Sequence, residues 1–330
     1  MAAEKTGSMK AVRYDSYGGG ADGLKHVEVP IPSPKKNEIL LKLEAASINP
    51  VDWKIQKGML RPFLPPKFPF TPVADVTGEV AEVGSEVTAF KKGDKLVGML
   101  NFPNGGGLAE FAVSPVNIMA IRPPELSPAE AAGLPTAAMT ALQALKSVGT
   151  KFNANDEPSN ILITAASGGV GHYALQLAKL AGHHVTATCG ARNMELMKTM
   201  GADEVLDYKS PEGAKLKSPS GRKYDGVIHC TTNISWSTFE PNLSTKGKVI
   251  DITPTFMTMA TYILKNTFSK KKLVPLLLNP KAEELQFIVS LAKEGKLKTV
   301  VDSTYPLSKA EEAWAKSISG HATGKIVVEM

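Results

Sequence analysis

A glycine-rich stretch of the sequence has the spacing that suits a bound dinucleotide. Residues Ile161–Gly171 read as an apolar strand, a tight turn and the start of a helix, and Ala166, Gly168 and Gly171 form an A-x-G-x-x-G fingerprint. Glycine lets the backbone approach a pyrophosphate, whose charge the N–H groups at a helix start stabilise. The predicted contacts are Ala166, Ser167, Gly168, Gly169, Val170 and Gly171. The alternative is a strand-to-helix turn without a ligand.

The end of the next strand determines which nicotinamide cofactor the sequence favours. NAD sites usually place an acidic residue about 20 residues further on, against the ribose hydroxyls. This chain has Cys189, Gly190, Ala191 and Arg192 instead. No carboxylate there repels a 2′-phosphate and a guanidinium can bind one, so we predict NADPH. An exposed Arg192 that opens the next helix is the alternative.

Cys189 has two interpretations, a reactive thiol or a small residue beside the adenosine ribose. No His or Lys lies next to it in the sequence to favour the thiolate. We therefore favour the second interpretation.

The elements around these residues alternate between strand and helix. Apolar strands are expected at 160–164, 184–188, 226–229 and 247–252, with helices at 171–181 and 194–200 between them. This rhythm predicts a doubly wound parallel sheet. One helix is expected over 127–145, because Ser127-Pro-Ala-Glu130 is a capping box with proline at the first helical position.

The first 120 or so residues have a different pattern, with short strand-like runs such as 38–43 and 78–83. A length of 330 residues suits two domains. We predict an α/β protein with a β-rich domain over 1–126, completed by about 290–330, and a nucleotide-binding domain over 127–289. The late helix 309–318 and strand 323–329 belong to the first domain.

Composition excludes several protein classes. The chain has 38 Lys and Arg against 32 Asp and Glu, a net charge of +6, and 2 cysteines without CxxC or Cys/His spacing. A disulfide framework and a structural zinc cluster are therefore not expected, and a reducing compartment fits. Residues 1–9 resemble neither a signal nor a transit peptide, and no run of 18 uncharged apolar residues exists.

Three stretches carry a family resemblance: Ala165–Gly171, Asn49–Asp52 and Gly201–Tyr208. They resemble the zeta-crystallin-like quinone oxidoreductases of the medium-chain dehydrogenase/reductase superfamily. Residues 49–58, 61–64 and 321–325 resemble its plant branch at the chloroplast envelope. The resemblance implies a GroES-like N-terminal domain joined by the C-terminal strand, with a Rossmann domain between them.

The resemblance also implies further site residues. Lys54 would reach the nicotinamide ribose or the substrate oxygen, where an ammonium could stabilise an enolate; an exposed loop charge is the alternative. Asn49 would hydrogen-bond near the nicotinamide, or form an Asx turn before Pro50. The remaining expected cofactor contacts are Tyr208, Ile252, Thr253, Gly320 and His321.

No metal is expected. Zinc-dependent relatives have a Cys within the segment that is Asn49–Asp52 here, and Gly-His-Glu where this chain has Ala74-Asp-Val76. Without a Lewis acid, hydride donation to an already electrophilic acceptor is favoured over alcohol oxidation. The expected acceptors are α,β-unsaturated ketones, including long-chain oxylipin enones, or quinones. The rival hypothesis is a non-catalytic NADPH-binding protein with a structural or RNA-contacting role.

A basic segment raises the question of membrane contact. Lys265 and Lys270–Lys272 lie beside apolar residues within 257–278. They could contact an anionic bilayer, or form a solvated helix face followed by a strand at a dimer edge. The resemblance implies a homodimer attached peripherally to the inner chloroplast envelope, with a cytoplasmic location as the alternative. No nucleic-acid partner is expected, because no basic stripe is interleaved with aromatic residues.

Overall fold

The computed structural model describes residues 7–153, 157–255, 258, 262–263 and 269–330. They form two compact units. Unit 1 comprises Met1–Thr136 and Pro280–Met330, and unit 2 comprises Ala137–Asn279.

The main sheet of unit 1 contains seven strands in the order β14-β15-β3-β4-β5-β7, with β6 also paired to β3. Its strands are β3 Glu38–Ile48, β4 Asp75–Val83, β5 Lys95–Met99, β6 Phe111–Pro115, β7 Met119–Ile121, β14 Val301–Pro306 and β15 Lys325–Glu329. Strands β1 (Ser8–Arg13) and β2 (Lys25–Pro30) form a separate antiparallel ribbon. Leu41, Val76 and Val328 lie in the apolar core of this unit.

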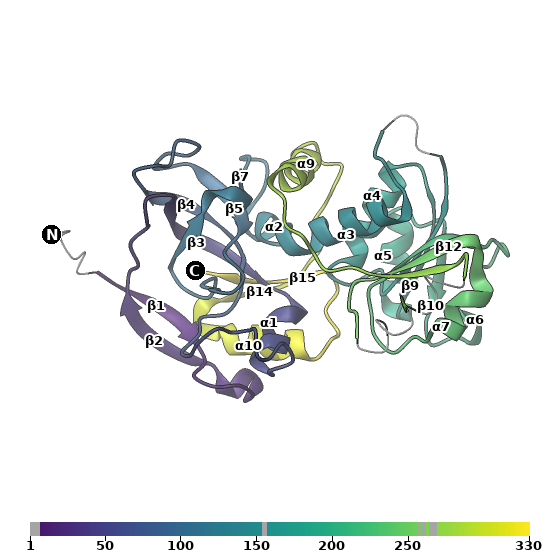
Figure 1. Ribbon diagram of the computed structural model, residues 1–330, viewed down its shortest axis with the longest axis horizontal. Helices are drawn as coiled ribbons and strands as arrows, with labels where there is room; N and C mark the ends of the chain where they lie inside the picture. The colour runs from purple at the N-terminus through teal and green to yellow at the C-terminus, as the bar shows by residue number, and fades with distance from the viewer. Residues whose placement is uncertain (1–6, 154–156, 256–257, 259–261, 264–268) are drawn as a thin grey trace. The chain divides into compact units, whose positions relative to one another are not determined.

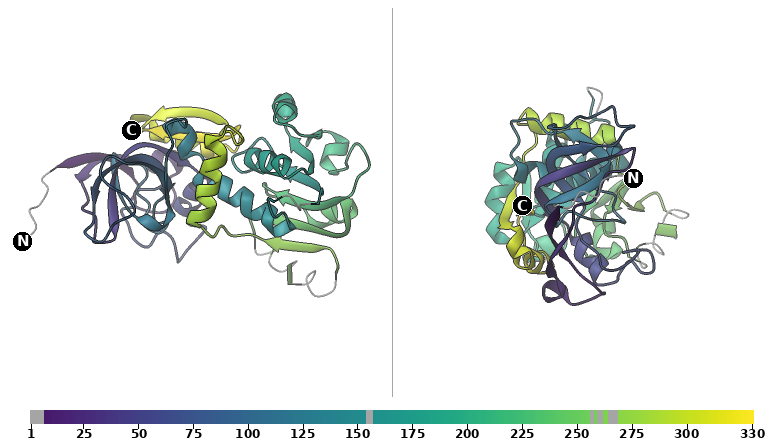
Figure 2. Two further views of the ribbon diagram at one scale, coloured as in Figure 1. Left: turned by 90° about the horizontal axis from the view of Figure 1, so that it is seen from above. Right: turned by 90° about the vertical axis from the view of Figure 1, so that its left-hand side faces the viewer.

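The last strand of the chain completes the first sheet. β15 is antiparallel to β3, and Ile326 pairs with Ile48. Figure 2 shows the C-terminal strands of this sheet in yellow. The pairing accounts for the division of unit 1 into two sequence segments.

Four α-helices accompany the sheet of unit 1: α1 Pro50–Gln56, α2 Pro128–Ala132, α9 Ala282–Lys293 and α10 Ala310–Ile318. Figure 1 shows α1 and α10 side by side, and the two helices are in contact. Trp314 of α10 is fully buried and donates its indole N–H to Gln56 Oε1 at 3.0 Å. The position of α1 therefore depends on a helix more than 250 residues later in the chain.

Unit 2 contains a six-stranded parallel sheet in the order β10-β9-β8-β11-β12-β13. The strands are β8 Asn160–Thr164, β9 His184–Cys189, β10 Glu204–Asp207, β11 Tyr224–His229, β12 Leu243–Asp251 and β13 Lys272–Pro275. Helices in the described part of this unit include α3 Pro135–Val148, α4 Gly171–Leu180, α5 Met194–Thr199, α6 Pro211–Ala214 and α7 Trp236–Phe239. Ile161, Leu162 and Ile163 are fully buried, as expected for a central parallel strand.

The helix expected over 127–145 is interrupted, which corrects the sequence interpretation. α2 begins at the Ser127–Glu130 capping box as predicted, but it ends at Ala132 with Gly133 as its C-cap, and α3 begins at Pro135. Proline lacks a backbone N–H and clashes with the preceding turn, so Pro135 starts a new helix rather than continuing the old one.

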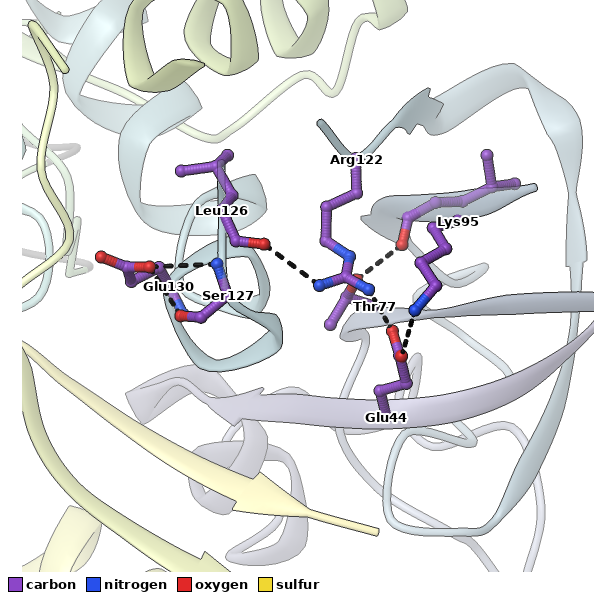
Figure 3. Close-up of polar contacts among 8 residues, drawn as sticks. Glu44, Thr77, Lys95, Arg122, Leu126, Ser127 and Glu130 are labelled. Atoms are coloured by element: carbon purple, nitrogen blue, oxygen red, sulfur yellow. Dashed lines mark hydrogen bonds and ion pairs between the residues drawn. The ribbon is translucent and has the colours of Figure 1, made fainter. Parts of the chain in front are cut away.

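Arg122 holds the segment that leads into α2 (Figure 3). Its buried guanidinium donates to the Leu126 carbonyl at 3.1 Å and to the Glu44 carboxylate, which also pairs with Lys95. Glu130 meanwhile accepts from the Ser127 hydroxyl at 2.6 Å. These contacts fasten the end of β7 to β3 and fix the start of α2.

The compact units divide the chain at different points from the predicted domains. The predicted boundaries follow residues 126 and 289, whereas the units change after residues 136 and 279. The physical reason is packing, because α2 contacts β3 and β4, and α9 contacts β7. In the part of the chain that the structure describes, no helix is both long and apolar enough to cross a membrane.

Candidate active site

The glycine-rich turn lies between β8 and α4 in unit 2. A Cβ atom on Gly171 would lie 2.4 Å from the Ala165 carbonyl oxygen and 2.6 Å from the Ala166 Cα. The Gly168 N–H donates to the same Ala165 carbonyl at 2.9 Å, which closes the turn. Glycine is therefore required at 171 by close backbone packing. The turn opens α4, whose first N–H groups suit an anionic phosphate.

Two residues outside the predicted cofactor contacts support this turn. The buried His172 places Nδ1 2.9 Å from the Gly168 carbonyl and stacks on Tyr173. Asn193 donates its side-chain N–H to Ser167 Oγ at 3.0 Å. The place of Asn193 next to Arg192 was an available signal, and the place of His172 at the start of the helix after the glycine turn was another.

The C-terminal edge of the parallel sheet gathers the other predicted residues of unit 2. Strand order reverses direction between β8 and β11, and ligands of doubly wound sheets bind at such a switch point. Cys189 ends β9, Gly190–Arg192 follow it, and Tyr208 follows the adjacent β10. The Tyr208 N–H donates to the Cys189 carbonyl at 3.1 Å, and a Cβ on Gly190 would lie 3.5 Å from the Tyr208 ring.

Cations lie at this edge together with the acidic residue Asp207. Arg192 is exposed in the turn Ala191–Asn193, and Lys209 Nζ lies 5.8 Å from the centre of the Tyr208 ring. Burial, followed by the nearby Asp207, raises the pKa of Cys189 to about 11. The thiol is therefore protonated at neutral pH, which favours its interpretation as a small packing residue.

On the other side of the switch point, the ends of β11 and β12 are joined by hydrogen bonds. The Ile252 N–H donates to the His229 carbonyl at 3.3 Å, and Thr253 Oγ1 donates to the Thr231 carbonyl at 2.9 Å. The His229 ring lies 3.0 Å from Thr164 Oγ1 of β8. Burial lowers the pKa of His229, so its imidazole is neutral at pH 7. His229 was not predicted as part of the site.

Asn49 occupies the centre of a buried polar cluster in unit 1. Its amide donates to Asp75 Oδ2 at 2.8 Å and to the Ser47 carbonyl at 3.3 Å, while its Oδ1 accepts from Lys325 Nζ at 2.5 Å. Both amide protons and one oxygen lone pair are thereby used within the protein.

The rest of the cluster fixes the start of α1 and of α3. Asp52 accepts from the Asn49 backbone N–H at 2.7 Å, and Asp75 accepts from the Thr136 hydroxyl at 2.6 Å. Burial raises the pKa of Asp52 to about 7 and also raises that of Asp75. Burial lowers the pKa of Lys325, while the attraction of both carboxylates opposes that change.

Lys54, Gly320 and His321 also belong to unit 1. Lys54 lies on α1, half-buried, with Nζ 5.8 Å from the Trp53 ring. Gly320 and His321 follow α10, the helix that contacts α1, and both are exposed. Gly320 has a φ of 71°, a left-handed conformation that favours glycine.

The donors in this cluster do not fit a zinc ion. Asn49 and Asp75 belong to the segments in which zinc-dependent relatives were expected to carry ligands, and here they bond to each other and to a buried ammonium. A divalent cation would be repelled by Lys325, and amide nitrogen is not a zinc ligand. Among the described residues, no group of three or more His, Cys, Asp or Glu side chains could hold a metal ion.

The basic segment expected to contact a membrane is described only in part. Lys265 lies outside the described residues. Lys271 donates to the Glu240 carbonyl at 2.6 Å, and Lys272 begins β13 beside β12. Part of this segment is therefore engaged in the fold of unit 2.

Comparison with known proteins gives consistent matches over nearly the whole chain. The chain is 67% identical over 323 residues to the chloroplast envelope quinone oxidoreductase homolog of Arabidopsis thaliana, covering 97% of this chain and 98% of that protein. The chain belongs to the quinone oxidoreductases of the medium-chain dehydrogenase/reductase superfamily. It is therefore an oxidoreductase, which confirms the family resemblance.

Further matches of this quinone oxidoreductase confirm the predicted fold class. An alcohol dehydrogenase GroES-like domain matches residues 35–124, and a zinc-binding dehydrogenase model matches residues 200–328. The quinone oxidoreductase structure from Coxiella burnetii has a TM-score of 0.89 and 31% identity, covering 98% of this chain and all of that one. The chloroplastic NADPH-dependent alkenal/one oxidoreductase of A. thaliana is 32% identical, covering 97% of this chain and 79% of that protein. Together these relatives support a nicotinamide cofactor.

Proposed function

We propose that this enzyme transfers hydride from NADPH to an electron-poor carbonyl compound without zinc. The acceptor class is an α,β-unsaturated ketone, including long-chain oxylipin enones, or a quinone. The observation that carries the proposal is the glycine turn at the switch point of the parallel sheet, with Arg192 rather than a carboxylate at the end of β9.

The residues of unit 2 provide a cofactor site. We assign the pyrophosphate to the turn Ala166–Gly171, beside the first N–H groups of α4. Arg192 pairs with a 2′-phosphate, and Tyr208 beside Gly190 offers a flat surface to the adenosine. Ile252 and Thr253 lie on the other side of the switch point, where the nicotinamide end belongs. NADPH, when bound, supplies the hydride.

The residues of unit 1 stabilise charge on the substrate, contact the cofactor and position these groups. We assign to Lys54 the stabilisation of negative charge on the substrate oxygen, and to Gly320 and His321 contacts with the cofactor. Asn49 has a positioning role, because its amide already bonds to Asp75, Ser47 and Lys325. Unit 1 then serves as the GroES-like catalytic domain, and unit 2 as the NADPH-binding domain.

The cluster chemistry determines which acceptors are suitable. Since these side chains do not fit a zinc ion, the carbonyl must be electrophilic before it binds, as enones and quinones are. Rate enhancement then comes mainly from holding the reacting atoms together, which is worth about 7–11 kcal/mol in well-oriented systems. A water or a nearby side chain delivers the proton that completes the reduction.

The chloroplast proteins among the relatives support a chloroplast location for this enzyme. Within that compartment we propose peripheral attachment to the inner envelope and assembly as a homodimer, with no nucleic-acid partner. A cytoplasmic enzyme is the alternative location.

The test of this function is steady-state cofactor oxidation against a panel of quinones, short enals and long-chain enones, with NADH in parallel. We expect turnover with NADPH and a clear preference over NADH. Arg192→Gln should lower kcat/KM for NADPH about 10- to 100-fold, as expected for loss of a charge-assisted pair, and leave that for NADH unchanged. Lys54→Ala should lower turnover on every acceptor.

Two outcomes would contradict the proposal. NADPH binding without turnover on any acceptor would favour a non-catalytic NADPH-binding protein with a structural or RNA-contacting role. Unchanged turnover and affinity in Lys54→Ala would remove that residue from the site.

A further inference from the structure

The loop of residues 57–69, which follows α1, exposes an unusual group of apolar side chains. Phe63 is 80% exposed and Met59 is 59% exposed, and Leu60 and Phe68 are also exposed. The N–H groups of Phe63 and Leu64 both donate to the Leu60 carbonyl, so residues 60–64 form a helix-like turn. Such a turn brings side chains three and four positions apart to neighbouring places. Met59, Leu60 and Phe63 are therefore presented together.

Tyr17 supports the loop from within unit 1. The Arg61 guanidinium lies 3.7 Å from the centre of the Tyr17 ring, and the Phe68 ring meets Tyr17 edge-on at 4.8 Å. The Tyr17 hydroxyl donates to the Leu64 carbonyl at 3.4 Å. Gly58 adopts a φ of 82° and admits Arg61 closely. The loop backbone thus has its own contacts, and Met59 and Phe63 are not needed to hold it.

The charged side chains of the loop are all positive. Between Asp52 and Asp75 the sequence has no acidic residue, and its cations are Lys54, Lys57, Arg61 and Lys67. Lys57, Arg61 and Lys67 are exposed and alternate along the chain with the exposed apolar residues. A surface that binds here must therefore be apolar within and negatively charged at its boundary.

We infer that the loop 57–69 is a docking surface for an anionic lipid bilayer, with Met59, Leu60 and Phe63 inserted among the lipids. Apolar tips bordered by cations match acyl chains below a layer of anionic headgroups. A stable protein partner would need about 800 Å² from each side, more than three loop side chains provide. An anionic bilayer accounts for the small apolar area of the loop, for its positive charge and for the exposure of its apolar side chains.

This inference deepens the proposed function, since the loop begins directly after the helix that carries Lys54. A lipophilic enone or quinone dissolves in a bilayer, so an enzyme docked through this loop meets its acceptor where the acceptor is concentrated. It differs from the sequence-based expectation, which assigned membrane contact to the segment 257–278.

Co-sedimentation of the NADPH-loaded enzyme with vesicles tests the surface. We expect binding to phosphatidylcholine vesicles that contain phosphatidylglycerol and little binding to pure phosphatidylcholine. The double variant Met59→Ser/Phe63→Ser should weaken binding by about tenfold or more. Lys57→Gln and Lys67→Gln should each weaken it about fivefold and reduce its salt dependence.

Leu277→Ser is the matched control, because Leu277 is 78% exposed and lies in the segment 257–278. It should bind vesicles like the wild type. Equal losses in Leu277→Ser and the double variant, or no binding of the wild type to the anionic vesicles, would overturn the inference. So would a double variant that binds vesicles normally but loses turnover on a water-soluble quinone. Vesicle binding without turnover would count only against the proposed activity.

Discussion

At the scale of single residues, the buried cluster in unit 1 contains one ammonium and two carboxylates. Lys325 and Asp75 are almost inaccessible to solvent, and Asn49 lies between them through hydrogen bonds to both. Removing one member of a buried charge set leaves its partners uncompensated, which costs far more than the pair itself contributes. Substitutions of the acidic and the basic members of the cluster should therefore change stability in different ways.

Lys325→Met should lower the free energy of unfolding by about 3–5 kcal/mol, because Asp75 and Asp52 would lose their buried counter-charge. Urea denaturation measures this directly. Lys92→Met is the control, since Lys92 is exposed, and it should stay within about 0.5 kcal/mol of the wild type. A similar small effect in Lys325→Met would show that the cluster does not depend on the ammonium.

Asp52 predicts a pH dependence of stability. Its pKa is raised to about 7 from 3.8, so the folded protein holds this proton more tightly than the unfolded chain. Stability from this group is therefore present at low pH and lost as pH rises through about 7. Asp52→Asn removes the titration and keeps an oxygen for the Asn49 N–H. Between the two pKa values, 3.8 and about 7, the free energy of unfolding of the variant relative to wild type should rise with pH by up to about 1.4 kcal/mol per pH unit. A pH-independent difference in urea titrations would refute it.

At the scale of elements, local patterns predicted the nucleotide-binding half well. β8 was expected at 160–164 and is found there, and α4 begins at Gly171 as expected. Buried parallel strands are continuous apolar runs and helix starts have local signals, so both can be recognised from a short stretch of sequence. The expected helix over 127–145 was wrong in its continuity, because Pro135 begins a second helix.

The glycine turn gives a prediction at this scale. Gly171→Ala would place a Cβ 2.4 Å from the Ala165 carbonyl oxygen, so β8, the turn or α4 must shift. We expect a stability loss of about 1–3 kcal/mol and at least tenfold weaker NADPH binding, measured by fluorescence titration. Gly221→Ala is the control, since its Cβ would meet no atom within 4 Å although Gly221 has a positive φ, and it should leave NADPH affinity unchanged. Normal NADPH affinity in Gly171→Ala would contradict a role of this turn in cofactor binding.

At the scale of the whole molecule, the residues that the sequence did not predict are linked over long distances. Lys325 and Asn49 are 276 positions apart, and Trp314 and Gln56 are 258 apart. No local periodicity reports such contacts, because they depend on β15 returning to β3. Asn49 and Lys54 were predicted from family resemblance, whereas Lys325 and His229 became visible only in the folded chain.

The central claim is hydride transfer from NADPH to an electron-poor acceptor, and isotope transfer tests it most directly. NADPH deuterated at C4, in each stereochemical form, would be incubated with the enzyme and an enone, and the product analysed by mass spectrometry. We predict that one form delivers a deuterium to the β-carbon of the saturated ketone while the other form does not. Bound NADPH that stays unoxidised with every acceptor, or product without deuterium from either form, would contradict the account.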